Sequence, residues 1–278
     1  MADTNQVPSS LALSAGALQE KCESVAKGKA SNTPGRIFAL AILAGIFIAC
    51  GALLMLFVKS DGSLSFGVSQ VLGGICFSLG LISVIVAGAE LFTGNNLMIQ
   101  AVLSKTISWG DMLKNWGIVY VGNLVGSLLI VAIVFFCDSA SMNGGEIGNA
   151  MINVACGKIN LSWSVIFFRG IMCNLLVCLA VWMGFAGKTV IDKIFTSMLP
   201  VMAFVACGFE HCVANMFFLP MGLVLKSSGF AYSGSANLDV LNVGGILFNI
   251  SAATLGNIVG GAILIGVIYW IAYHKKQA

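Results

Sequence analysis

Charged residues and proline are scarce in this sequence. Asp, Glu, Lys and Arg make up 9% of the 278 residues and proline occurs 4 times, whereas hydrophobic residues make up 58%. Soluble domains carry roughly 25% charged residues, so the composition excludes a water-soluble fold. The formal net charge of +3 and the lack of a basic cluster exclude a nucleic-acid partner.

Sequence motifs for nucleotide, metal and catalytic sites are also missing. There is no Walker loop and no GxGxxG, GxSxG or HExxH pattern. The 9 cysteines lie mostly in apolar runs, and Cys173/Cys178 and Cys207/Cys212 have neither CxxC nor zinc-ligand spacing. We therefore expect no enzyme, no cofactor and no metal, and we interpret the cysteines as packing residues.

Long apolar runs dominate what is present. A helix that crosses a membrane needs about 20 apolar residues. Runs of this kind occur at 36–58, 68–103, 113–137, 161–186, 194–225 and 244–273. The second and fifth runs are too long for one crossing, and each contains a polar cluster, at 88–95 and 208–215. We therefore predict an all-α membrane protein with six transmembrane helices, of which the second and fifth are broken.

The distribution of Lys and Arg predicts the orientation. Six spans put both termini on one side of the membrane, and most basic residues fall on that side, including Lys105, Lys114, Lys188 and Lys193. The opposite side has Lys59, Lys158 and Lys226. Both termini are therefore expected in the cytoplasm, with the chain embedded in the cytoplasmic (inner or plasma) membrane and in contact with lipid.

Three regions are expected along the chain: a cytoplasmic N-terminal segment at 1–35, a six-span domain at 36–273 and a cytoplasmic tail at 274–278. Within the first region, residues 11–29 place Leu11, Ala15, Leu18 and Cys22 on one face. This pattern indicates an amphipathic helix that lies on the cytoplasmic membrane surface. The alternative is a solvated tail.

The two polar clusters match each other. The first reads GAELFTGN and the second GFEHCVAN, so both have the pattern G-x-E-x-x-x-x-N. The spans that follow share G-N-x-V-G, in GNLVGSLL (122–129) and GNIVGGAIL (256–264). A repeat of three spans places its second copy upside down, so we predict a 3+3 inverted repeat over about 36–137 and 161–273. The two breaks would then face each other near the membrane midplane.

The broken spans contain ionisable groups. Irregular backbone at membrane depth must be buried in protein or line a cavity, and helix N-termini attract anions. His211 lies in the second break, and an imidazole could exchange a proton with a passing weak acid. Glu90 and Glu210 occupy equivalent positions, which favours a structural role in which each carboxylate binds backbone N–H groups at its break. General acid–base work by these carboxylates is the alternative.

Asparagines and an arginine also lie inside the apolar spans. We expect Asn123 and Asn257 to bridge helices, because buried amides need hydrogen-bond partners. Asn174 and Asn215 are expected to line a pathway. Arg169 is expected to pair with a carboxylate or to reach the outer surface.

Five stretches together resemble one known family. They are GGICFSLGL (73–81), GAELFTG (88–94), KNWGIVYVGNLVG (114–126), CNLLVCLAVWM (173–183) and GFEHCVANMFFLPMG (208–222). They are similar to the formate/nitrite transporter family over all six spans, and within it they look most like the formate channels. The resemblance implies a homopentamer of aquaporin-like protomers, each with its own pore for small monovalent anions such as formate, nitrite or hydrosulfide.

The resemblance also implies which residues form the substrate pathway. Leu91 and Phe204 belong to its two constrictions, with Leu91 on the cytoplasmic side. Phe77, Leu81 and Phe92 are their apolar neighbours on the pathway. Thr93 and Asn174 resemble the residues that hydrogen-bond the central histidine, which is His211 here.

Vestibule lysines and two departures complete what the resemblance implies. The outer vestibule lysine is Lys158 and the inner one is Lys29, with Lys27 close enough to be the alternative. Cys207 stands where relatives have Ser, and Arg169 resembles a basic residue of the nitrite-type branch, which leaves the substrate open.

Three functions follow from these residues. The first is a channel or proton-coupled carrier for a small weak-acid anion that passes the apolar constrictions with help from His211 and protons. The second is a channel for a neutral solute such as ammonia or water. The third is a membrane redox or metal protein that uses Cys and His211.

Overall fold

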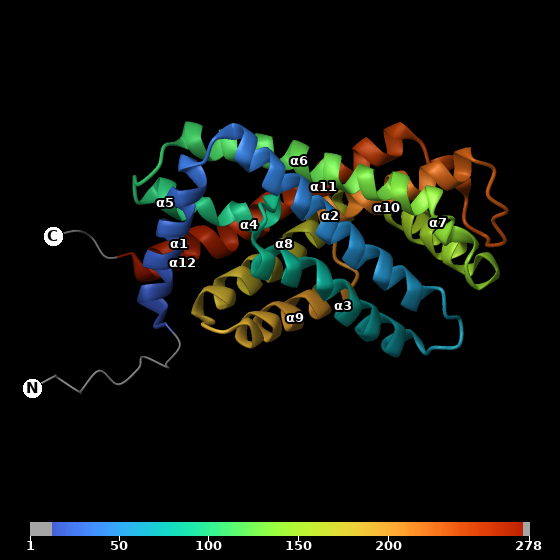
Figure 1. The fold of residues 1–278 in the computed structure, drawn as a ribbon, viewed down its shortest axis with the longest axis horizontal. Coiled ribbons are helices and arrows are strands. Elements are labelled where there is room, and N and C mark those ends of the chain that lie inside the picture. The colour runs from blue at the N-terminus through green and yellow to red at the C-terminus, as the bar shows by residue number, and fades with distance from the viewer. Residues whose placement is uncertain (1–12, 275–278) are drawn as a thin grey trace, which may run out of the picture.

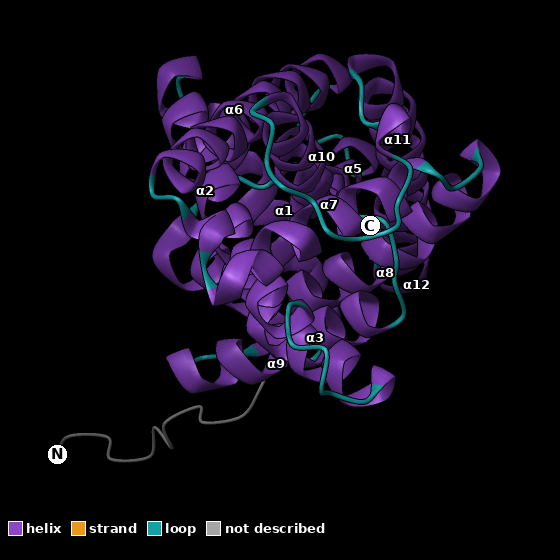
Figure 2. Ribbon diagram, turned by 90° about the vertical axis from the view of Figure 1, so that its right-hand side faces the viewer, coloured by secondary structure: helices purple, strands orange, loops and turns teal. Residues whose placement is uncertain are grey.

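The described part of the protein consists of helices and connecting loops. The computed structural model describes residues 13–274, in which no β-strand occurs (Figure 2). Five helical segments are long and apolar enough to cross a membrane: Pro34–Lys59, Phe66–Gly88, Trp109–Phe136, Trp163–Ala186 and Val243–Tyr273. A shorter apolar helix spans Cys212–Ser227. The expected all-helical, multi-pass membrane fold is confirmed at this level.

The helices follow one another along the chain in two series. The first contains α1 (Ala15–Ser31), α2 (Pro34–Lys59), α3 (Phe66–Ser83) with the π-helical η1 (Val84–Gly88), α4 (Phe92–Asn95), η2 (Asn96–Met98), α5 (Ile99–Leu103) and α6 (Trp109–Phe136). The second contains α7 (Glu146–Ile159), α8 (Trp163–Ala186), α9 (Val190–Ala206), α10 (Cys212–Ser227), α11 (Val243–Ile258), the π-helical η6 (Val259–Val267) and α12 (Ile268–Tyr273).

Packing repeats between the two series. Helix α2 packs against α3 and α6, α8 packs against α9 and α11, and α3 packs against α9. Glycines allow the closest approaches, because a Cβ at Gly126 would lie 2.1 Å from the carbonyl oxygen of Ile42, and one at Gly260 would lie 2.1 Å from that of Ile171. These glycines end the two G-N-x-V-G motifs, so the motif marks the tightest helix contact in each series.

Helices α1 and α7 lie at opposite ends of the molecule. Figure 1 shows α1, α5 and α12 at one end of the molecule and α7 at the other. We call these the α1 end and the α7 end. The sequence did not predict α7, because its 14 residues are too few and too polar for a span and lie between two long apolar runs.

Helix α1 differs from its prediction in what its apolar face contacts. It begins at Ala15, and Leu11 lies outside the described residues, as do 275–278 of the expected tail. Leu18 and Cys22 are buried against Trp182 and Leu97 of the helical bundle. The apolar face is therefore covered by the protein itself, where the sequence predicted a membrane surface.

Candidate functional site

The two polar clusters form two similar turns of the chain. Gly88 has φ +82° and Gly208 has φ +68°, values that glycine adopts without strain. After each glycine the backbone becomes extended, at Leu91 and at His211, and a helix then begins, α4 or α10. Leu91 and His211 are thus equivalent N-cap residues.

One asparagine holds each turn. Asn123 on α6 accepts a hydrogen bond from the N–H of Phe92 at 2.9 Å and donates to the carbonyl oxygens of Ala41 and Glu90 at 2.8 and 2.9 Å. Asn257 on α11 repeats these bonds with the N–H of Cys212 and the carbonyl oxygens of Gly170 and Glu210, at 2.9, 2.8 and 2.9 Å. Both amides are buried, so each turn is fixed by three bonds shielded from water.

Each glutamate binds a lysine and an asparagine. In the first series, Lys29 Nζ lies 2.8 Å from Glu90 Oε2, to which Asn95 Nδ2 also donates at 2.6 Å. Here the structure differs from the prediction, because side chains, not freed backbone N–H groups, occupy this carboxylate. Lys29 rather than Lys27 makes the ion pair, as the end of α1 carries it to the turn.

The second series has the same network. Lys158 Nζ at the end of α7 lies 3.0 Å from Glu210 Oε1, and Asn215 Nδ2 donates to Glu210 Oε2 at 2.7 Å. Asn215 also donates to Asn249 Oδ1 at 2.7 Å, and Asn249 Nδ2 donates to the carbonyl oxygen of Lys158 at 3.0 Å. Asn215 therefore orients Glu210 and lines neither of the two cavities that approach His211, whereas the sequence predicted a position on the pathway.

His211 is buried at the centre of the molecule. Its Nδ1 accepts a hydrogen bond from the N–H of Ala214 at 3.0 Å, so the ring caps α10. A neutral ring with Nδ1 as acceptor carries its hydrogen on Nε2, and Nε2 lies 3.1 Å from Thr93 Oγ1. In this arrangement the imidazole donates a hydrogen bond to Thr93, and the threonine hydroxyl can donate onward.

Asn174 lies next to this centre but has different partners from those implied. Its Nδ2 donates to the carbonyl oxygens of Thr93 and Asn257 at 3.2 and 2.7 Å and to Asn96 Oδ1 at 2.9 Å. None of its hydrogen bonds with the described residues reaches the His211 ring. Asn174 is fully buried and holds the backbone of Thr93, so it positions the histidine's partner.

Two cavities approach the centre from opposite ends. At the α1 end, a cavity of about 720 Å³ is lined by Lys21, Lys29, Arg36, Leu81, Glu90, Leu91 and Lys193, among others. At the α7 end, a cavity of about 140 Å³ is lined by Lys59, Gln70, Phe77, Lys158, Phe204 and His211, among others. The two share no lining residue, and buried apolar side chains lie at the inner side of each.

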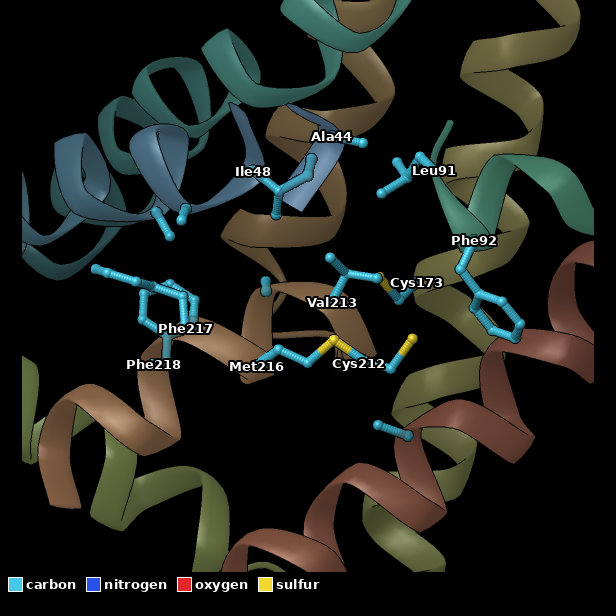
Figure 3. Packing of buried hydrophobic residues seen from close by; sticks show 14 of the residues in the cluster. Ala44, Ile48, Leu91, Phe92, Cys173, Cys212, Val213, Met216, Phe217 and Phe218 are labelled. Atoms are coloured by element: carbon cyan, nitrogen blue, oxygen red, sulfur yellow. The ribbon is translucent and has the colours of Figure 1, made fainter. Parts of the chain in front are cut away.

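The predicted constriction residues divide between these cavities. Leu81 and Leu91 line the α1-end cavity, and Phe77 and Phe204 line the α7-end cavity. The Phe204 ring stacks on His211 with centroids 5.9 Å apart. Phe92 differs from its prediction. It packs against Tyr120 with centroids 5.0 Å apart, lines neither cavity and points away from Leu91 (Figure 3).

Comparison with known proteins identifies this arrangement. The family model described as "Formate/nitrite transporter" matches residues 16–271. The chain belongs to the formate/nitrite transporter family. The resemblance seen in the sequence is thereby confirmed.

Relatives of known structure and function match over nearly their whole length. The chain is 40% identical over 271 residues to the "Formate channel FocA" of Escherichia coli (strain K12), covering 94% of each protein. A solved "Pentameric formate channel with formate bound" matches with a TM-score of 0.77 and 39% identity, over 87% of this chain and 98% of that chain. An "FNT family ion channel" matches with a TM-score of 0.80 and 30% identity, over 92% and 98%.

Membership in the formate/nitrite transporter family assigns the chain to transport and not to catalysis. These relatives are channels, and the family contains transporters of formate and nitrite. Within residues 13–274, no group of three or more His, Cys, Asp or Glu side chains is placed to hold a metal ion. The two cavities are therefore the candidate parts of a transport pathway.

Sequence reasoning missed three buried amides of this site. Asn115 accepts from Asn95 Nδ2 at 2.8 Å, as Asn249 does from Asn215, and Asn96 accepts from Asn174. All three are polar residues in apolar surroundings, the same signal that selected Asn123 and Asn257. They lie outside the matched motifs, so the repeat did not single them out.

Proposed function

We propose that the protein is a membrane channel or proton-coupled carrier for small monovalent weak-acid anions, with formate as the first candidate substrate. The observation that carries this proposal is the pair of cavities at opposite ends, which His211 and Leu91 line together with apolar side chains, and each of which is also lined by a lysine that pairs with a buried glutamate. The names of its relatives, which include formate channels, supply the substrate class.

The proposed architecture is a 3+3 inverted repeat of six spans. Segments Phe66–Gly88 and Phe92–Leu103 together form one broken span, and α9 with α10 forms the other. The equivalent bonds of Asn123 and Asn257 support this pairing. We further propose that residues 36–273 are the channel domain, that both termini are cytoplasmic, and that five protomers assemble in the lipid bilayer as in the pentameric relative.

Basic residues line the path of the anion to the centre from both ends. Lys158 and Lys29 lie in the α7-end and α1-end cavities, which would be the outer and inner vestibules. A bare anion that leaves water for an apolar constriction loses solvation free energy on the order of several kcal/mol. The rings formed by Phe77 with Phe204 and by Leu81 with Leu91 therefore favour passage of a neutral acid over passage of an anion.

His211 acts between these constrictions through its hydrogen on Nε2. A neutral imidazole with Nδ1 bonded to the Ala214 N–H stabilises an anion by donating a hydrogen bond, directly or through Thr93. To protonate the anion, His211 must first take up a proton on Nδ1, which breaks the bond to Ala214. Proton transfer is therefore coupled to loosening of the first turn of α10.

Nitrite and hydrosulfide are the second candidates, because they are also small weak-acid anions and the family description includes nitrite. Arg169 near the α7-end cavity is compatible with either anion. A neutral solute such as ammonia or water is the remaining alternative, and the basic residues of the two cavities argue against it, since they offer no gain to an uncharged molecule.

The test is a flux comparison in proteoliposomes of the purified protein. Formate, nitrite, hydrosulfide and ammonium are offered separately, and swelling or isotope uptake is followed with empty liposomes as the baseline. We expect formate uptake well above the baseline and none for ammonium beyond it. Uptake of ammonium alone would overturn the anion assignment, and faster nitrite than formate uptake would exchange the first and second candidates.

A further inference from the structure

We propose that Lys59 and Arg169 form an anion-collecting site at the α7-end cavity, which receives a small carboxylate or nitrite-like anion before it reaches Lys158 and His211. This inference rests on the proposed function and adds the residues that set how well the pathway captures its substrate from dilute solution. It concerns the α7-end cavity alone.

The charge of Lys158 is already largely offset. Its Nζ lies 3.0 Å from Glu210 Oε1, and the Glu210 side chain is 2% exposed. An ion pair at this distance acts on a distant anion as a dipole, whose attraction falls off faster than that of a single charge. Lys158 can therefore guide an anion inside the cavity, but long-range attraction needs another positive group.

Lys59 supplies such a group at the end of α2. It lines the α7-end cavity together with Gln70, and its Nζ donates to Gln70 Oε1. Gln70 Nε2 in turn donates to the carbonyl oxygen of Ala206 at 2.8 Å. The ammonium is thus held over the cavity by a neutral amide, and its full charge is available to an incoming anion.

Arg169 on α8 supplies the second group, because it contacts a residue that lines this cavity. Its Nη1 donates to the carbonyl oxygen of Gly208 at 3.4 Å, and Gly208 lines the same cavity. The equivalent residue of the first series is Leu40, since the N–H of Glu90 donates to the Leu40 carbonyl as that of Glu210 does to Arg169. Leu40 lines the α1-end cavity, so a side chain at this position faces a cavity.

No carboxylate offsets the charge of either group within the part of the chain that the structure describes. Among residues 13–274, no ion pair joins Lys59 or Arg169 to a carboxylate, whereas Lys158 has such a pair. The acidic residue nearest to Lys59 in the sequence, Asp61, lines a different cavity with Glu146, and its carboxylate accepts from Ser63. Asp61 and Glu146 therefore line one pocket at the α7 end. Lys59 and Lys158 line the other, which also contains His211.

The chemistry of the two cations indicates the ligand class. A guanidinium presents parallel N–H groups that match the two oxygens of a carboxylate or of nitrite, and an ammonium adds a point charge. The cavity volume of about 140 Å³ favours anions of a few atoms. A site of this kind raises the local anion concentration and the rate of entry.

The test measures anion currents in bilayers with the protein in one known orientation. Lys59→Gln, Arg169→Gln and the double variant are compared with the wild type while formate is added from the α7 side. We expect the half-saturating formate concentration to rise about two- to fivefold in each single variant and about tenfold in the double variant. The maximal current should stay the same, and values measured from the α1 side should not change.

Three controls separate this effect from misfolding and from general charge loss. Lys59→Arg keeps the charge and should keep the wild-type half-saturating concentration, whereas Arg169→Lys keeps the charge but loses the paired N–H groups and should raise this concentration less than Arg169→Gln does. Lys114→Gln removes one positive charge on an exposed residue that lines neither cavity and should change nothing. Salt of about 0.5 M should bring wild type and double variant together, because screening shortens the reach of the charges.

Failure of this inference and failure of the proposed function would give different results. A wild type that carries formate and a correctly assembled double variant with an unchanged half-saturating concentration from the α7 side would overturn this inference alone. A wild type without formate, nitrite or hydrosulfide current would overturn the proposed function. An equal rise from both sides would also contradict the inference, because it would indicate damage to the shared centre.

Discussion

The side chains of Asn123 and Asn257 make equivalent hydrogen bonds on the two sides of the protein. Each accepts from the first N–H of a helix and donates to the carbonyl oxygen of a buried glutamate. These bonds close the backbone where a helix stops inside the apolar interior, because the irregular segment could not stay there with unpaired N–H and C=O groups.

Asn257→Ala is expected to destabilise the protein by about 2–4 kcal/mol, because it removes the partners of one N–H and two carbonyl groups at a buried turn. Asn123→Ala should have an effect of similar size. Thermal unfolding of the detergent-solubilised protein measures both. Asn160→Ala, at an exposed position, is the matched control and should leave the unfolding temperature near that of the wild type.

Gly260→Ala is expected to force α8 and η6 apart. The new Cβ would lie 2.1 Å from the carbonyl oxygen of Ile171, where backbone cannot yield easily, so we expect a loss of about 1–3 kcal/mol or more. The control is Gly117→Ala, since no atom lies within 4 Å of its Cβ and alanine favours a helix by about 1 kcal/mol. A Gly260→Ala protein as stable as the wild type would show that the helix contact is looser than the structure indicates.

Substitutions of His211 can separate its two roles. His211→Asn keeps a side-chain oxygen that can accept from the Ala214 N–H but cannot take up a proton, whereas His211→Phe loses the cap, at a cost of about 1 kcal/mol. If His211 passes protons, both variants should lose the pH dependence of formate flux between about pH 5 and pH 8. Flux in His211→Asn that follows the wild-type pH profile would leave the histidine with hydrogen bonding only.

Substitutions of Lys158 and Glu210, which form a buried ion pair, should have strongly non-additive effects on the free energy of unfolding. Lys158→Gln leaves a carboxylate that is 2% exposed with amide partners only, and breaking a buried pair in this way costs about 3–5 kcal/mol. The double variant Lys158→Gln/Glu210→Gln should be more stable than Lys158→Gln alone in thermal unfolding. The same comparison of single and double variants at Lys29 and Glu90, whose side chains are 23% and 6% exposed, should give a smaller non-additive effect. Equal effects at the two ion pairs would argue against burial as the cause of the non-additivity.

Much of the fold could be predicted from the sequence because lipid leaves few choices. Apolar length predicts the helices that cross the membrane, and the matched motifs G-x-E-x-x-x-x-N and G-N-x-V-G point to Glu90, Asn123 and their equivalents before any coordinates are considered. The polar residue of each motif must be satisfied internally, which is why its position is informative.

The partners of those residues were harder to predict. Lys29 and Lys158 lie on helices outside the apolar runs, so nothing in hydropathy joins them to Glu90 and Glu210. The sequence also did not distinguish the roles of Asn174 and Asn215. A buried amide can line a path or orient a neighbour, and only three-dimensional contacts separate these two possibilities. Burial of α1 against Trp182 and Leu97 was equally hidden, since an apolar face looks alike whether lipid or protein covers it.

The bonds that meet at Thr93 have a consequence for the sequences of the two halves. Its hydroxyl faces His211 and its carbonyl oxygen accepts from Asn174 and from the thiol of Cys178, so every one of these partners comes from the second half of the chain. By the alignment of the two turns, the counterparts of Thr93 and His211 are Val213 and Leu91. Two identical halves could have the same turns and the same tight helix contacts, but they would hold the same residue at positions 91 and 211. The present centre therefore requires the two halves to differ in sequence, and neither half could be exchanged for a copy of the other.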